Sequence, residues 1–204
     1  MKQRSLPQRA DEPWKPTRAQ LEAASSKRLP DLLRSGLDVV FCGINPGLYS
    51  AAIGHHFGRP GNRFWPTLFA AGFTPHLFTG FNDHELLSLN FGATNIAPRT
   101  TATADQLSSD ELVRGAHSLR RKIREYQPRF LAVLGITAYR SAFLLPKAAL
   151  GLQLELIGST RVWVLPNPSG LNAHHPPALL QKLFTEFREA AGVPRATEAT
   201  ARDR

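Results

Sequence analysis

The chain has 204 residues, of which 42% are hydrophobic, a composition that excludes general disorder and allows one core of substantial size. Its formal net charge is +9, which suits a polyanionic partner such as nucleic acid, although a basic protein without such a partner has the same signature. No apolar run is long enough to cross a bilayer, and the N-terminus has no hydrophobic signal segment. We therefore expect an intracellular protein that is not secreted, with no membrane partner; in a bacterium it would be cytoplasmic and associated with the nucleoid.

Composition along the chain indicates one folded unit between two tails. Residues 1–17 are polar, basic and proline-containing, and we expect them to be disordered. A single domain is expected over residues 18–193, followed by a frayed tail over 194–204. Cys42 is the only cysteine, which excludes an intrachain disulfide and a cysteine-ligated metal site of the usual kind.

The first half of the domain contains two helical patterns and then two strands. Residues 17–36 carry two short helical patterns, one on each side of Pro30. Residues 37–44, LDVVFCGI, are almost continuously apolar, which is typical of a strand buried on both faces. After a glycine-rich loop, residues 62–72 predict a short helix with Pro66 in its first turn. A further short helix over 83–90 precedes a second strand over 91–97.

The second half continues the alternation of helices and strands. Ser108 stands three residues before Glu111, a capping-box spacing that predicts a helix ending before Pro128. Residues 129–136, RFLAVLGI, predict a second buried strand, and Thr137 is a candidate N-cap for the helix after it. Two more strands flank residues 158–159, and a final helix covers 176–192. This order predicts an α/β fold, a three-layer α/β/α sandwich with a mainly parallel central sheet.

Three loops are expected to leave the carboxyl ends of the strands, where ligands bind in sheets of this kind. They read GINPGLYSAAIGHHFGRPGN, NIAPRTT and LPNPSGLNAHHPP. The standard phosphate-binding glycine motifs, the serine-hydrolase GxSxG and the zinc motif HExxH are all missing from them. What remains at the first strand end is Asn45, whose amide can orient a water or bind a carbonyl and an N–H together; alternatively it makes only a local turn bond.

Several other polar residues of these loops have two readings. His56 is the stronger functional candidate of the pair His55–His56: it contacts DNA phosphate or the base, or it is a plain surface histidine. We expect no metal because adjacent histidines seldom ligate one ion. Arg59 and Arg63 can contact DNA phosphate or be simply solvated. Ala93 and Asn95 lie on the second strand, whose end should face the pocket.

The segments VFCGINPG, GHHFGRPGNRFW, AGFT and VLPNPSGLNAHHP together resemble the mismatch-specific uracil/thymine-DNA glycosylases, a branch of the uracil-DNA glycosylase superfamily. The resemblance covers roughly residues 29–190, and the pairing of GINPG with NPSGL is its most specific feature. It implies an α/β/α fold, flipping of a base out of the DNA, and hydrolysis of the bond between base and deoxyribose without a cofactor.

The resemblance also implies roles for individual positions. Asn45 matches the catalytic amide that positions the attacking water, and Phe57 the aromatic on which the flipped base stacks. Leu171 matches the apolar wedge that fills the gap in the duplex, and Gly170 and Asn172 beside it are candidates for contacts with the DNA backbone. The remaining matches line the base pocket: Gly43, Ile44, Ser50 and Asn167.

The expected activity is that of a monofunctional DNA glycosylase that leaves an abasic site, because no lysine in the matched motifs is placed to form a Schiff base. The expected partner is double-stranded DNA with a G·U or G·T mismatch, with single-stranded DNA as a further substrate and the chain acting as a monomer. Two alternatives stay open: a module that binds damaged DNA without turnover, and a hydrolase of small nucleotides.

Overall fold

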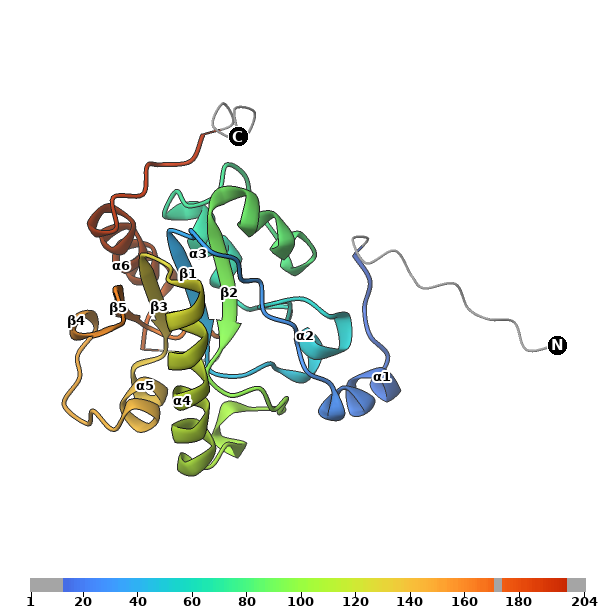
Figure 1. Cartoon of the computed structure of the whole chain (residues 1–204). Coiled ribbons are helices and arrows are strands. Elements are labelled where there is room, and N and C mark those ends of the chain that lie inside the picture. The colour runs from blue at the N-terminus through green and yellow to red at the C-terminus, as the bar shows by residue number, and fades with distance from the viewer. Residues whose placement is uncertain (1–12, 171–173, 198–204) are drawn as a thin grey trace.

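The computed structural model describes residues 13–170 and 174–197, and its centre is a five-stranded sheet (Figure 1). The strand order is β2-β1-β3-β5-β4, and every neighbouring pair is parallel except β4 and β5. The strands are β1 (Val39–Gly43), β2 (Phe91–Asn95), β3 (Phe130–Leu134), β4 (Gly151–Ile157) and β5 (Thr160–Leu165). The α/β class and the mainly parallel sheet are confirmed.

Helices cover both faces of this sheet. One core packs the sheet against α3 (Phe64–Ala70), α6 (Pro177–Ala190) and the 3₁₀ helix η2 (Gly80–Leu89). The other packs it against α4 (Ser109–Tyr126) and α5 (Ile136–Phe143), which lie on the near side of the sheet in Figure 1. The shorter helices are α1 (Arg18–Ala23), η1 (Ala24–Ser26), α2 (Leu48–Ile53) and η3 (Ala104–Gln106).

The central strands are apolar throughout because each of their faces meets one of the two cores. Along β1, Val39 and Phe41 belong to the core beneath α3 and α6, whereas Val40 and Cys42 belong to the core beneath α4 and α5. The strand alternates its side chains between the two faces, so a continuous apolar run is what burial on both sides requires. The edge strand β4 differs, since its Leu154 is fully exposed.

The capping box is present as expected: the Ser108 hydroxyl accepts from the Glu111 N–H, and the Glu111 carboxylate accepts from the Ser108 N–H. Thr137 is not a cap, because α5 already begins at Ile136 with Gly135 in the N-cap position. Gly135 has φ 132° and donates its N–H to the Leu165 carbonyl, so the chain turns from β3 into α5 two residues earlier than predicted.

One expectation about the first part of the chain is corrected. The helix expected directly after Pro30 is absent, because residues 31–36 are not helical. Instead Leu32 exchanges two backbone hydrogen bonds with Ala93, which pairs backbone groups at the outer edge of β2. After Val193, the Ala196 N–H donates to the Gly72 carbonyl over 2.8 Å. Within the described residues, no helix is long and apolar enough to span a membrane.

Candidate active site

A cavity of about 310 Å³ opens where the parallel strands β1, β2, β3 and β5 end. This is the edge at which the three polar loops were expected to converge, and each of them contributes to its wall. The wall includes most of the residues predicted for the site: Gly43, Ile44, Asn45, Ser50, His56, Phe57, Asn95 and Asn167.

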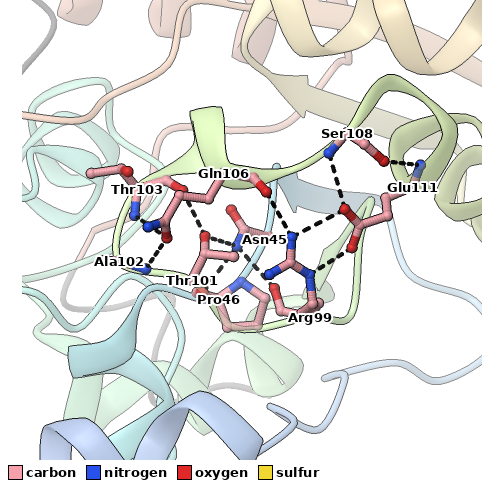
Figure 2. Close-up of polar contacts among 9 residues, drawn as sticks. All are labelled: Asn45, Pro46, Arg99, Thr101, Ala102, Thr103, Gln106, Ser108 and Glu111. Carbon is pink, nitrogen blue, oxygen red and sulfur yellow. Dashed lines mark hydrogen bonds and ion pairs between the residues drawn. The ribbon is translucent and has the colours of Figure 1, made fainter.

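Asn45 is held at this cavity by its amide nitrogen (Figure 2). Nδ2 donates to the Thr101 hydroxyl at 2.6 Å, to the Arg99 carbonyl at 2.9 Å and, more weakly, to the Pro46 carbonyl at 3.2 Å. These acceptors engage both amide hydrogens, and no donor in the described parts of the chain contacts Oδ1. The oxygen is therefore the end of the amide that can accept a hydrogen bond from a molecule in the cavity.

The acceptors around Asn45 are themselves fixed. The Thr101 hydroxyl donates onward to the Thr103 carbonyl at 2.7 Å, which sets the direction of its own lone pairs toward Asn45. The Arg99 guanidinium donates to both oxygens of Glu111, at 2.6 and 3.0 Å, and to the Gln106 carbonyl (Figure 2). These bonds from Arg99, with the Ser108 N–H, lower the pKa of Glu111 to about 2, so the carboxylate is charged at neutral pH.

Phe57 forms one wall of the cavity in a strained conformation. Its φ is +53°, in the left-handed region that costs a residue other than glycine about 1–2 kcal/mol. Its ring stacks on Phe64 with the centroids 3.9 Å apart. Gly43 leaves room for this wall, because a Cβ there would lie 2.6 Å from Asn95 Oδ1 and 3.3 Å from the Phe57 ring. The Asn95 amide and the Phe57 ring therefore stand side by side over Gly43.

His56, next to Phe57 in the lining of the cavity, is only 2% exposed. Its Nε2 is 2.9 Å from the Pro30 carbonyl, which can only accept, so the ring carries its proton on Nε2. Burial is the main cause that lowers its pKa, and the ring is neutral at physiological pH. A metal role gains no support, since the described residues contain no group of three or more His, Cys, Asp or Glu side chains that could hold an ion. Cys42 is buried within β1, and that burial raises its pKa, which leaves the thiol unreactive.

The two arginines of the first loop have different surroundings. Arg63 donates to the Ser169 and His175 carbonyls at 2.6 and 2.8 Å, and its N–H donates to the Pro168 carbonyl at 2.9 Å. It therefore ties the first loop to the NPSG loop rather than presenting its charge to solvent. Arg59 is exposed at the cavity, and the structure gives it no partner among the residues described.

The NPSG loop is folded on itself before it leaves the described range. Asn167 Oδ1 accepts the Ser169 N–H at 3.0 Å, and Gly170 packs directly on the Gly61 carbonyl, where a side chain would collide. Leu171 and Asn172, the predicted wedge and its neighbour, lie outside the described residues.

Ala93 is the one predicted pocket residue that the structure places elsewhere. It is fully buried in the core beneath α3, and it does not line the cavity. Side chains on one face of a strand recur every second residue, so the position two residues further along β2, Asn95, occupies the strand end instead. β2 ends at Asn95, two residues before the predicted end of this strand at residue 97.

Sequence reasoning missed the contribution of the loop after β2. Thr101, Ala102, Thr103, Ala104 and Asp105 line the cavity, and of these only Thr101 belongs to the segment NIAPRTT that was expected at the site. The clustering of threonines after a strand end was a usable signal, because hydroxyls there can bond a neighbouring loop.

A comparison with protein families identifies the family of the chain. The family model described as Uracil DNA glycosylase superfamily matches residues 30–190, which is most of the chain and includes every segment that lines the cavity except Leu29. Members of this superfamily hydrolyse the N-glycosidic bond of uracil-type lesions during DNA repair. The chain therefore belongs to the uracil DNA glycosylase superfamily, and it acts on DNA as an N-glycosylase.

Proposed function

We propose that the protein extrudes uracil from G·U mismatches in duplex DNA into this cavity and hydrolyses its glycosidic bond, leaving an abasic site. The observation that carries the proposal is that Asn45, Phe57 and Asn95 border a single cavity of about 310 Å³. Ligand sites for small molecules begin at roughly 300 Å³, so the space suits one base better than a complete nucleotide.

Each of these three residues has a contact to offer a flipped uracil. The Phe57 ring provides a flat apolar surface, and stacking of a base on such a ring contributes roughly 1–3 kcal/mol. The Asn95 amide has both a donor and an acceptor, which match the O4 and N3–H of uracil at adjacent atoms. Recognition at this edge extends to thymine opposite guanine and to modified pyrimidines, because the contacts do not involve C5.

Asn45 acts on the attacking water. With Nδ2 occupied by Thr101 and Arg99, the free Oδ1 accepts one hydrogen of the water and aims its lone pair at the anomeric carbon. An amide is too weak a base to remove the proton early, so the sugar becomes cation-like before the water adds. The base leaves as an anion, which hydrogen-bond donors at its oxygens stabilise.

Hydrolysis by water, without cleavage of the strand, is part of the proposal. A lyase step needs an amine to form a Schiff base with the sugar. No lysine is among the residues that line the cavity in the described parts of the chain. The mismatch lowers the cost of extrusion, and single-stranded DNA, in which no pair must open, is a further substrate.

The proposal is tested with an end-labelled G·U duplex, incubated with the protein and then treated with alkali. Alkali-labile cleavage at the uracil is expected, and Asn45→Ala should reduce its rate by about 100-fold or more, as removal of a preorganised catalytic group does. Gln181→Ala, an exposed amide in α6 outside the cavity, is the control and should keep the wild-type rate. Tight binding without product would identify a binding module, and hydrolysis of free deoxyuridine alone would identify a nucleotide hydrolase.

A further inference from the structure

A buried carboxylate outside the cavity forms hydrogen bonds with the first loop just before Phe57. Asp83, in η2, is 4% exposed and does not line the cavity. Its Oδ1 lies 2.9 Å from His55 Nδ1, and its Oδ2 accepts the backbone N–H of His56 at 2.7 Å. Burying a carboxylate is costly unless its oxygens are hydrogen-bonded, and here both oxygens bond to consecutive residues of one loop.

The loop is fixed on the other side of Phe57 as well. The N–H of Gly58 donates to the Ser50 hydroxyl at 3.0 Å, and the His56 ring bonds to the Pro30 carbonyl at 2.9 Å. The peptide unit after Phe57 and both the backbone N–H and the ring of the preceding residue, His56, are thus tied to other parts of the fold. A strained backbone conformation persists only where its surroundings determine it in this way, and Phe57 has a φ of +53°.

The position of η2 relative to the loop is also set. Gly80, the first residue of η2, packs so closely on Gly58 that a Cβ would lie 2.7 Å from the Gly58 Cα. The helix that carries Asp83 therefore has little freedom to move toward or away from the loop. Its carboxylate meets His55 and His56 at a fixed place.

We infer that Asp83 is a positioning residue that holds Phe57 in the orientation needed to stack on the flipped base. This inference rests on the proposed function, in which Phe57 is the stacking surface. Without the carboxylate, the His56 N–H loses its acceptor, and Phe57 can relax toward a negative φ. Its ring then leaves the stack on Phe64 and no longer forms the cavity wall.

A double-mutant cycle tests the inference, because residues that act through one another give losses that do not add. Asp83→Ala should lower the single-turnover rate on the G·U duplex about tenfold, comparable to Phe57→Ala, as expected for loss of a base–aromatic stack. In the Phe57→Ala background, Asp83→Ala should lower the single-turnover rate by less than a further twofold. Asp83→Asn, whose amide oxygen can still accept the His56 N–H, should restore the rate to within about threefold of wild type.

Inhibition by free uracil provides a second measurement that does not depend on contacts with the duplex. The inhibition constant should rise in Asp83→Ala and in Phe57→Ala, and stay unchanged in Glu85→Gln, an acidic residue of the same helix whose carboxylate accepts from Asn82 Nδ2. If Asp83→Ala does not fold, Asp83→Asn takes its place in the double-mutant cycle. Its smaller loss of rate should then disappear in the Phe57→Ala background.

Two outcomes would overturn the inference: an equal loss from Asp83→Ala in both backgrounds, or full activity of a folded Asp83→Ala protein. Either result leaves the proposed function standing, since the wild-type protein is then active. A wild-type protein that releases no uracil from any DNA would defeat the proposed function itself.

Discussion

Replacing Thr101 by valine removes the hydroxyl that locks the Asn45 amide while keeping the shape of the side chain. Thr101 is 4% exposed, so water does not readily take its place. Asn45 loses its shortest hydrogen bond, 2.6 Å, but keeps the bond to the Arg99 carbonyl. A net hydrogen bond contributes about 0.5–1.5 kcal/mol, and if all of it serves to orient the amide, the chemical step slows roughly 2- to 13-fold.

Stability should change little in this variant. The Thr103 carbonyl loses the Thr101 hydroxyl as its donor, but Thr103 is exposed and water can replace the bond. We expect the free energy of unfolding to fall by about 1 kcal/mol. The effect on the rate should therefore exceed any effect that follows from partial unfolding.

Single-turnover cleavage of the G·U duplex with enzyme in excess measures the chemical step. Thr101→Ser keeps the hydroxyl and should retain most of the wild-type rate. Thr100→Val is the matched control, because that buried hydroxyl donates to the Lys27 carbonyl at 2.8 Å and does not contact Asn45. Equal rates for Thr101→Val and Thr100→Val would refute the idea that Thr101 orients the catalytic amide.

Three further predictions follow from the cavity and its surroundings. Gly43→Ala should displace the Asn95 amide and slow uracil release about tenfold or more. Gly47→Ala should not slow it, because a Cβ at Gly47 meets no atom within 4 Å. Equal rates of the two variants would contradict the packing argument. Arg59→Gln should reduce the slope of log affinity against log salt for duplex DNA by about 1, and an unchanged slope excludes a phosphate contact. Because the pKa of His56 is lowered in the folded protein, the unfolded chain takes up a proton below about pH 6.5 that the folded chain does not. The free energy of unfolding should therefore fall as the pH drops below about 6.5, by up to about 1.4 kcal/mol per pH unit. Urea unfolding should show a weaker pH dependence for His56→Gln, and identical slopes would show that another group is responsible.

The fold class could be predicted because it depends on patterns that neighbouring residues carry. The apolar runs that became β1 and β3 are uninterrupted, since both faces of a central strand are buried. The capping box at Ser108 is equally local, because its two bonds join residues only three apart. The second helix after Pro30 was wrong for the opposite reason: Leu32 pairs with Ala93, a residue 61 positions away that no local pattern reveals.

The candidate site shows the same division. The sequence could predict that Asn45 and Asn167 follow strands and so meet at one edge of a parallel sheet. It could also predict that Gly43 lines the pocket. The environments of the two arginines, the burial of His56 and the place of Ala93 in the core could not, because they depend on which carbonyls and side chains arrive from distant segments.

The sequence by itself determined which elements form and which loops share an edge of the sheet, because hydrophobic periodicity and capping act over a few residues. Only the tertiary structure decided how the site is held: Thr101 beside Asn45, and Asp83 behind Phe57. These hydrogen bonds join residues 27 and 56 positions apart, and bonds of that kind form only after the packing of both cores has fixed the loops in space.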